Sequence, residues 1–299
     1  MRWRLILYVV GLLTLFFGLT MVVPLAVSLL FKDGSGIPML LSLAFTIFFG
    51  ASMTIGFKGA KIADIRQREG MAIVFFGWTA MGFFGALPFF LSGEDVSFTN
   101  AFFESVSGFT TTGASIFTNI ERHAEGILFW RSFIQWLGGM GIIVLSLAVL
   151  PFLKVGGMQL YKAEVPTPFP DKLKPRIQET AVTLWKVYLL FTFLQILMLM
   201  AGGMNLYEAV CHTFTTMPTG GFSTKNASIA HYNNAYFDTV FILFMLMAGI
   251  NFSLHYQMLK GKPLAIWRDA EGRFFLFLSL VLVLLVSWNI YGEVYHTIG

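Results

Sequence analysis

Seven apolar runs, each about 20 residues long, limit the folds that this chain can adopt. A helix of roughly 20 apolar residues crosses the hydrocarbon core of a bilayer. The runs lack the alternation of a strand, and every backbone polar group in lipid must be satisfied internally, so helices are favoured over a barrel. The runs cover 5–30, 37–57, 71–91, 127–152, 181–203, 236–258 and 273–292. The sequence therefore predicts an all-α, multi-pass membrane protein with about seven transmembrane helices.

Composition supports this class and excludes others. Only 12% of the residues are charged, about half the share of a soluble domain. The net charge of +4 is spread over short loops, which argues against a nucleic-acid partner and leaves membrane lipid as the surrounding medium. The single cysteine, Cys211, excludes an internal disulfide and a multi-cysteine metal site. The first apolar run is too long for a signal peptide.

The distribution of Lys and Arg predicts the orientation. With a cytoplasmic N-terminus, 16 of the 20 basic residues fall on the cytoplasmic side, as the positive-inside rule requires. The remaining four are Lys32, Arg122, Arg131 and Lys225. The outer segments hold nine acids: Asp33, Glu94, Asp95, Glu104, Glu121, Glu125, Glu208, Asp238 and Glu293. A negatively charged outer face at the entrance of a pore would concentrate cations, although each acid alone is more simply explained as a solvated loop charge.

A repeat at an offset of 108 residues contains the most informative motif. Two apolar stretches, 98–110 and 205–217, are too short to cross a bilayer, and a Thr/Gly-rich tract follows each. Residues 101–115 align with 209–223, with identical pairs Ala101/Ala209, Thr111/Thr219, Gly113/Gly221 and Ser115/Ser223. We expect two re-entrant half-helices, capped by Asn205 in the second and by Ser97 or Thr99 in the first.

The chemistry of these tracts suits a potassium ion. Backbone carbonyls can replace the hydration shell of K⁺ without a costly fixed charge. Carbonyl alignment requires dihedrals that β-carbon residues resist, so glycine is expected at Gly113, Gly220 and Gly221. Hydroxyls of Thr111, Thr112 and Thr219 offer further oxygens, and the half-helices direct their negative dipole ends at the ion.

Simpler explanations exist for the individual residues. Small residues also permit close helix packing, which we favour for the run 136–141, where a bend is the other option. Glu104 and His212 occupy equivalent places on the half-helices, where anchoring by hydrogen bonds is favoured over a proton relay. The sequence contains no familiar catalytic motif, so neither an enzyme nor a catalytic residue is predicted.

Four blocks of sequence resemble the Trk/Ktr/HKT superfamily of potassium transporters, and within it the bacterial Trk-type (TrkH-like) membrane subunit. They are 102–114, 135–145, 155–161 and 220–224. The resemblance implies two leading helices and four helix–pore-loop–helix units around one pore, with filter carbonyls from 111–113 and 219–221. It also implies K⁺ as the transported ion, the bacterial inner membrane, a homodimer and a cytosolic nucleotide-binding regulatory subunit.

Measured against four units, the chain holds two units and the start of a third. We expect leading helices over 1–60, a first unit over 61–155, a second over 156–262, and the first helix of an incomplete third over 263–299. The expectation is the N-terminal part of a longer subunit; a natural half-protein that pairs with itself is the alternative. Other functions to consider are a non-conducting scaffold and a secondary transporter or symporter for another solute.

Overall fold

The computed structural model describes residues 1–59, 67–93, 96–139, 141 and 177–291. Every regular element in these ranges is a helix, which confirms the predicted fold class. The longer helices are α1 (Trp3–Thr20), α2 (Val22–Phe31), α3 (Gly36–Gly56), α4 (Gln67–Leu91), α5 (Phe98–Phe109), α6 (Glu125–Gly139), α9 (Ile177–Ala201), α10 (Leu206–Thr216), α11 (Ala235–Gly249), α12 (Phe252–Leu259) and α14 (Ala270–Ile290). Three short ones are η1 (Ile120–Arg122), η2 (Ser228–Tyr232) and α13 (Ala265–Arg268).

Five of the predicted spans are helices long and apolar enough to cross a membrane. They are Trp3–Phe31, Gly36–Gly56, Arg68–Leu91, Val182–Ala201 and Ala270–Ile290. The first combines α1 and α2, which meet at Met21. Of the predicted span 127–152, the structure describes 127–139, which lie in α6, and 141, whereas 140 and 142–152 lie outside the described residues. The chain is therefore a multi-pass membrane protein.

The prediction of one continuous helix over 236–258 is wrong. Helix α11 ends at Gly249 and α12 begins at Phe252, and the two are bent by 101°. Asn251 begins the new helix, because its side chain accepts a hydrogen bond from the Ser253 amide. A side chain that caps a helix start favours a chain break at that point, and apolar content alone does not reveal it.

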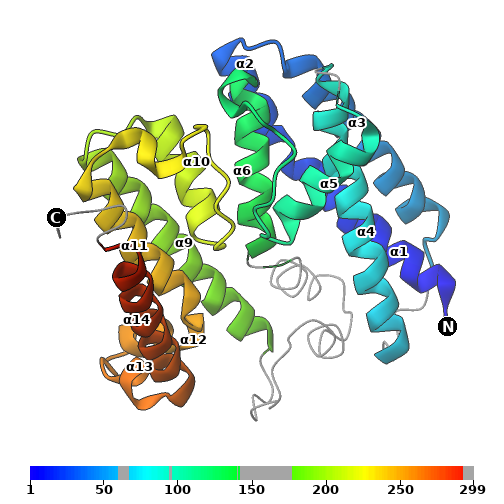
Figure 1. Cartoon of the computed structure of the whole chain (residues 1–299). Helices are drawn as coiled ribbons and strands as arrows, with labels where there is room; N and C mark the ends of the chain where they lie inside the picture. The colour runs from blue at the N-terminus through cyan, green and yellow to red at the C-terminus, as the bar shows by residue number, and fades with distance from the viewer. Residues whose placement is uncertain (60–66, 94–95, 140, 142–176, 292–299) are drawn as a thin grey trace.

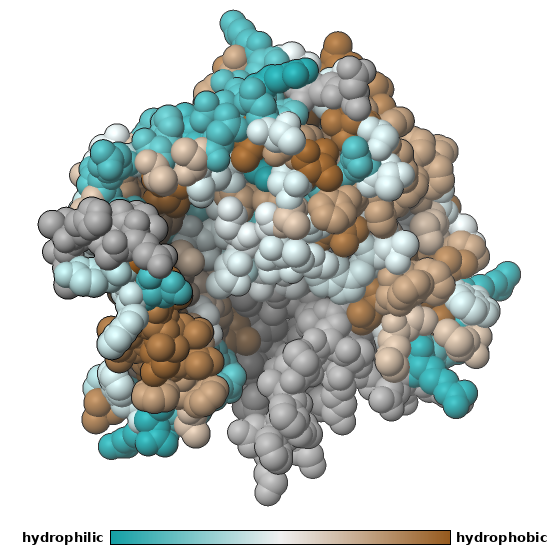
Figure 2. Space-filling view, in the orientation of Figure 1, coloured by the Kyte–Doolittle hydropathy of each residue, from teal (hydrophilic) through white to brown (hydrophobic). Residues whose placement is uncertain are grey.

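Helix α14 presents its apolar side chains outward. None of its 18-residue apolar window is buried, and the exposed side chains include Phe274, Leu282 and Trp288. Figure 2 shows a hydrophobic patch over this helix, with hydrophilic residues gathered above and below it. A helix that is apolar all round is expected in lipid.

The repeat seen in the sequence is also a repeat of structure. The order of a long helix, a half-helix and a second helix occurs in α4, α5 and α6 and recurs in α9, α10 and α11, as Figure 1 shows. The offset of 108 also places η1 at Ile120 and η2 at Ser228. Helix α6 packs against both α5 and α10, so it lies between the two half-helices.

Asp33 joins the loop before α3 to the start of α6. Its carboxylate accepts hydrogen bonds from Ser28 Oγ at 2.6 Å, the Ser35 amide at 2.9 Å and the Gly126 amide at 2.5 Å. Partial burial raises the pKa of Asp33, but these hydrogen bonds outweigh it and bring the pKa below its ordinary value. The carboxylate therefore stabilises the fold in its charged form.

This contact predicts a pH dependence. A carboxyl group with a lowered pKa contributes stability above its unfolded pKa and loses it as the pH falls through the folded value. The unfolding temperature of the wild type should therefore fall between pH 5 and pH 3 more steeply than that of Asp33→Asn. Thermal unfolding in detergent measures both slopes. Equal slopes would show that Asp33 does not contribute.

Candidate ion-conduction site

Both half-helices begin with a capping side chain, as predicted. Ser97 Oγ accepts from the Asn100 amide at 3.2 Å, and Asn205 Oδ1 accepts from the Glu208 amide at 2.9 Å. The Glu208 carboxylate, which a full capping box would turn back to the Asn205 amide, instead pairs with Lys225 Nζ at 2.7 Å. At 12 and 11 residues, α5 and α10 are too short to cross a bilayer.

The second cap offers a modest stability test. Asn205→Ala removes the acceptor for the Glu208 amide and should cost about 1 kcal/mol of stability. Asn100→Ala is the control, because that side chain is exposed and the residue contributes its backbone amide to a cap. Unfolding by denaturant should separate the two variants. Equal losses would remove Asn205 as the determinant of where α10 starts.

The two tracts leave their half-helices through the same pair of backbone hydrogen bonds. The Thr111 amide bonds to Gly108 O at 3.0 Å, and the equivalent Thr219 amide bonds to Thr216 O at 2.9 Å. The next amide reaches back five residues in each: Thr112 to Ser107 O at 3.0 Å, and Gly220 to Thr215 O at 3.0 Å. This pair is the Schellman closure of a helix C-terminus. The two units therefore share one backbone geometry at these tracts.

Left-handed backbone recurs at equivalent places. Thr111 and Thr219 have φ values of 55° and 59°, and Gly113 and Gly221 have 76° and 77°. Glycine adopts such angles without strain, whereas a β-branched residue there is an outlier. Backbone strain of this kind clusters at functional sites. Two threonines held in the same strained conformation therefore mark the tracts as a candidate site.

Gly220 does not require glycine for the reason that we expected. Its φ is not among the positive angles that Gly113 and Gly221 adopt. Gly220 instead packs closely against α6, where a β-carbon would lie 2.5 Å from Gln135 Cδ and the end of that side chain would have to shift. The prediction of a special dihedral at Gly220 is therefore wrong, and the feature that the structure shows at this position is close packing against α6.

The two tracts lie against each other and against α6. A β-carbon on Gly113 would contact the carbonyl oxygen of Gly220, so the tracts approach closely there. On α6, a β-carbon at Gly138 would contact Phe109 O, and one at Gly139 would contact Pro218. The glycine pair of α6 therefore fits between the ends of the two half-helices, which confirms the close packing expected for it.

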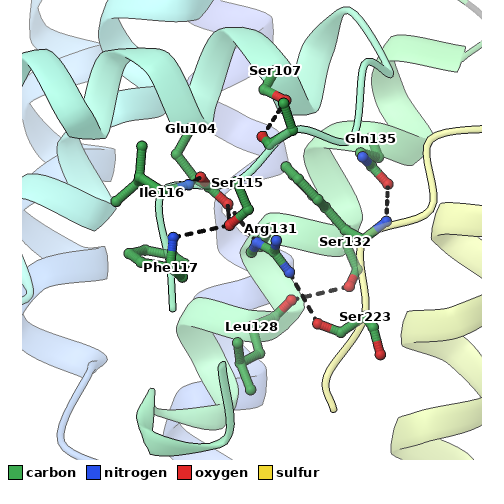
Figure 3. A network of polar contacts seen from close by, with 12 residues as sticks. Glu104, Ser107, Ser115, Ile116, Phe117, Leu128, Arg131, Ser132, Gln135 and Ser223 are labelled. Carbon is green, nitrogen blue, oxygen red and sulfur yellow. Dashed lines mark hydrogen bonds and ion pairs between the residues drawn. The ribbon is translucent and has the colours of Figure 1, made fainter. Parts of the chain in front are cut away.

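A buried ion pair lies behind the tracts (Figure 3). Arg131 Nε on α6 donates to Glu104 Oε1 on α5 at 2.6 Å, and the two side chains are 2% and 0% exposed. Glu104 also accepts from Ser115 Oγ at 3.0 Å and from the Ile116 amide at 2.9 Å. Glu104 is therefore an anchor of its half-helix, as favoured. The simpler explanation of Glu104 as a solvated loop charge is wrong, because its side chain is buried with Arg131.

The same arginine reaches the second tract. Arg131 Nη1 donates to Ser223 O at 2.9 Å, and its guanidinium carbon lies 3.6 Å from the centre of the Phe222 ring. One turn further along α6, Gln135 Oε1 accepts from the Phe222 amide at 3.2 Å. Helix α6 thus holds the segment that follows Gly221 by two polar side chains.

His212 anchors the second half-helix. It is 1% exposed, and its Nε2 lies 2.9 Å from Tyr232 Oη and 3.4 Å from Thr224 Oγ1. These contacts connect α10 to η2 and to the segment after the tract. His212 thus anchors α10 as Glu104 anchors α5, but through different partners. The expected anchoring role of His212 is confirmed.

The structure brings together the residues predicted for the site and adds two that sequence reasoning missed. Gly113 and Gly220 meet, while Thr112, Thr219 and Gly221 are exposed on the tract surface. The missed residues are Arg131 and Gln135. A signal was present for Arg131, because an ionisable residue inside an apolar helix points to a functional site. Among the described residues, no cluster of three His, Cys, Asp or Glu side chains could hold a metal ion.

Two repeated units, each with a re-entrant half-helix followed by a strained Thr/Gly tract, define a pore-loop membrane protein. The TrkH family model, described as a cation transport protein, matches residues 37–294. The chain belongs to this family.

Relatives and a solved structure agree. The Trk system potassium uptake protein TrkH of Escherichia coli (strain K12) is 43% identical over 312 residues, which cover 100% of this chain and 63% of that protein. TrkG of the same strain is 36% identical, with 96% of this chain and 60% of that protein covered. The crystal structure of the potassium transporter TrkH from Vibrio parahaemolyticus matches with a TM-score of 0.82 and 35% identity, over 97% of this chain and 59% of that one. The chain thus spans about three fifths of the length of these relatives.

Proposed function

We propose that this chain takes part in potassium uptake across the bacterial inner membrane, with oxygens of the two tracts facing the ion. The tract residues are Thr111, Thr112, Gly113, Thr219, Gly220 and Gly221. The single observation that carries the proposal is the repetition of one strained backbone geometry in two tracts that meet at Gly113 and Gly220. The relatives are named as potassium uptake proteins, which supports K⁺ as the ion.

The physical case rests on charge. A K⁺ ion leaving water needs several oxygens, and neutral carbonyls supply them without trapping the ion. The half-helices α5 and α10 end at the tracts, and the negative end of a helix dipole favours a cation there. The site therefore works through fixed dipoles, and the charged pair behind it is neutral overall.

The remaining features of the proposal come from the resemblance to the potassium transporter superfamily and from the distribution of Lys and Arg in the loops. The units run over 61–155 and 156–262, after leading helices over 1–60, and 263–299 begin a third. The N-terminus lies in the cytoplasm, since Lys and Arg are enriched on that side. The remaining filter oxygens come from further units of the same kind. The functional assembly is a homodimer in lipid with a cytosolic nucleotide-binding regulatory subunit.

A matched pair of glycines tests the filter role. Gly221 and Gly203 have φ values of 77° and 97°, and a β-carbon on either meets nothing within 4 Å. Alanine at each therefore introduces similar strain and no steric clash, but only Gly221 belongs to a tract. Gly221→Ala should lower the ratio of Rb⁺ to Na⁺ flux about tenfold, a change worth about 1.4 kcal/mol, whereas Gly203→Ala should leave the ratio unchanged.

The flux is measured in proteoliposomes that contain the chain, and in parallel a chimera that joins it to the part of Escherichia coli TrkH that it does not match. The chimera supplies the further units if the chain alone does not conduct. An equal effect of the two alanines on the flux ratio would show that Gly221 has no special relation to the ion. Absence of Rb⁺ flux in both proteins would overturn the uptake proposal.

A further inference from the structure

The ion pair of Glu104 and Arg131 connects the two tracts through side chains. Glu104 holds the segment that follows the first tract, at Ser115 and Ile116. Arg131 holds the second just past Gly221, at the Ser223 carbonyl and the Phe222 ring. The 2.6 Å bond between them completes a continuous path from one tract to the other.

Stability alone is a weak reason for such a pair. Both side chains are almost fully buried, and removing two charges from water is so unfavourable that a buried ion pair often adds little net stability. What a buried, hydrogen-bonded pair fixes well is geometry, because each partner must keep its position or leave a charge unpaired. The guanidinium is also planar, so it positions Glu104 and Ser223 at a defined angle.

We propose that Glu104 and Arg131 act as a clamp that holds the two tracts in register, and that ion discrimination depends on this clamp. They are positioning residues, since their contacts are to the segments that follow the tracts. The dependence of discrimination on the clamp rests on the proposed function, whereas the clamp itself is a property of the chain. The two parts are therefore tested separately.

The clamp is tested by amide hydrogen exchange on the purified 299-residue chain. The Gln in Glu104→Gln can still accept from the Ile116 amide, but it loses the ion pair that reaches Ser223. Exchange should therefore rise about tenfold in 222–225, the segment that Glu104 does not touch. Arg131→Met should produce the reciprocal rise in 115–117. Exchange that rises only next to each substituted residue would overturn the clamp.

A double variant covers the case in which a single variant does not fold. Glu104→Gln with Arg131→Met removes both charges and leaves side chains of similar volume, a change that proteins often tolerate. Exchange should rise in both segments. The control is the same double change in the ion pair Arg2–Glu69, which also has a 2.6 Å bond but links the start of α1 to that of α4. That control should leave exchange in both tracts unchanged.

Ion flux then separates geometry from charge. If only charge neutrality mattered, the double variant would keep the wild-type ratio of Rb⁺ to Na⁺ flux, because it is neutral. The clamp predicts that this ratio falls about tenfold in the double variant and stays at the wild-type value in the Arg2–Glu69 control. A wild-type ratio in the double variant would overturn the dependence. Absence of Rb⁺ flux in the wild type would count against the proposed function, while the exchange measurements would still decide on the clamp.

Discussion

Replacing Gly113 by aspartate is expected to abolish Rb⁺ uptake in cells that lack their own potassium uptake systems. A β-carbon on Gly113 would contact the Gly220 carbonyl oxygen, so any side chain there pushes the two tracts apart. The φ of 76° adds strain, of about 1 kcal/mol for a non-glycine residue. The new carboxylate also adds a fixed charge to a site of neutral dipoles, which holds a cation too tightly for rapid release.

Gly261→Asp is the matched control for this substitution. Gly261 also has a positive φ, 86°, and a β-carbon there meets nothing within 4 Å. It lies after α12, away from the tracts. Uptake by the chain, or by its chimera with Escherichia coli TrkH, should survive Gly261→Asp and be lost in Gly113→Asp. Retained uptake in Gly113→Asp, with equal protein in the membrane, would show that the first tract does not line the ion path.

The largest effect on stability is expected from Glu104→Ala. This variant leaves Arg131, which is 2% exposed, without its carboxylate. Removing one partner of a buried pair typically costs about 3–5 kcal/mol. Denaturant unfolding in detergent measures this loss. The double change to Gln and Met should lose much less, because no unpaired charge is left behind.

The comparison pair again provides the control. In Arg2–Glu69 the arginine is 40% exposed, so Glu69→Ala leaves a cation that water can reach. Its loss of stability should therefore be smaller than that of Glu104→Ala. If Glu104→Ala loses no more than Glu69→Ala, the guanidinium of Arg131 finds solvent or another partner, and the buried pair does not hold the site together.

Much of the fold follows from local signals in the sequence. The spans follow from apolar length, and the half-helices follow from short apolar stretches with Ser97 and Asn205 at their starts. Thr and Gly recur at an offset of 108 residues, which identifies both tracts in the sequence. The structure repeats the same dihedrals at these positions. The first two signals depend on residues close together in the chain, where sequence patterns are most informative, and the third depends on the repetition of residue types.

The misses depend on contacts between distant segments. Arg131 contacts Glu104 27 residues away and Ser223 92 residues away, and a count of charges by segment does not reveal such a pairing. Gly220 packs closely against the Gln135 side chain, a tertiary contact that a dihedral argument does not include. The 101° bend before α12 lies within a continuous apolar run, so hydropathy alone predicts a straight span.

Anomalous diffraction from crystals of the transport-competent protein grown in Rb⁺ tests the central claim most directly. We expect an anomalous peak bounded by backbone oxygens of Thr111–Gly113 and Thr219–Gly221, and expect it to weaken when Na⁺ replaces Rb⁺. A protein that takes up Rb⁺ but shows its peaks away from both tracts would contradict the assignment of these residues to the ion path.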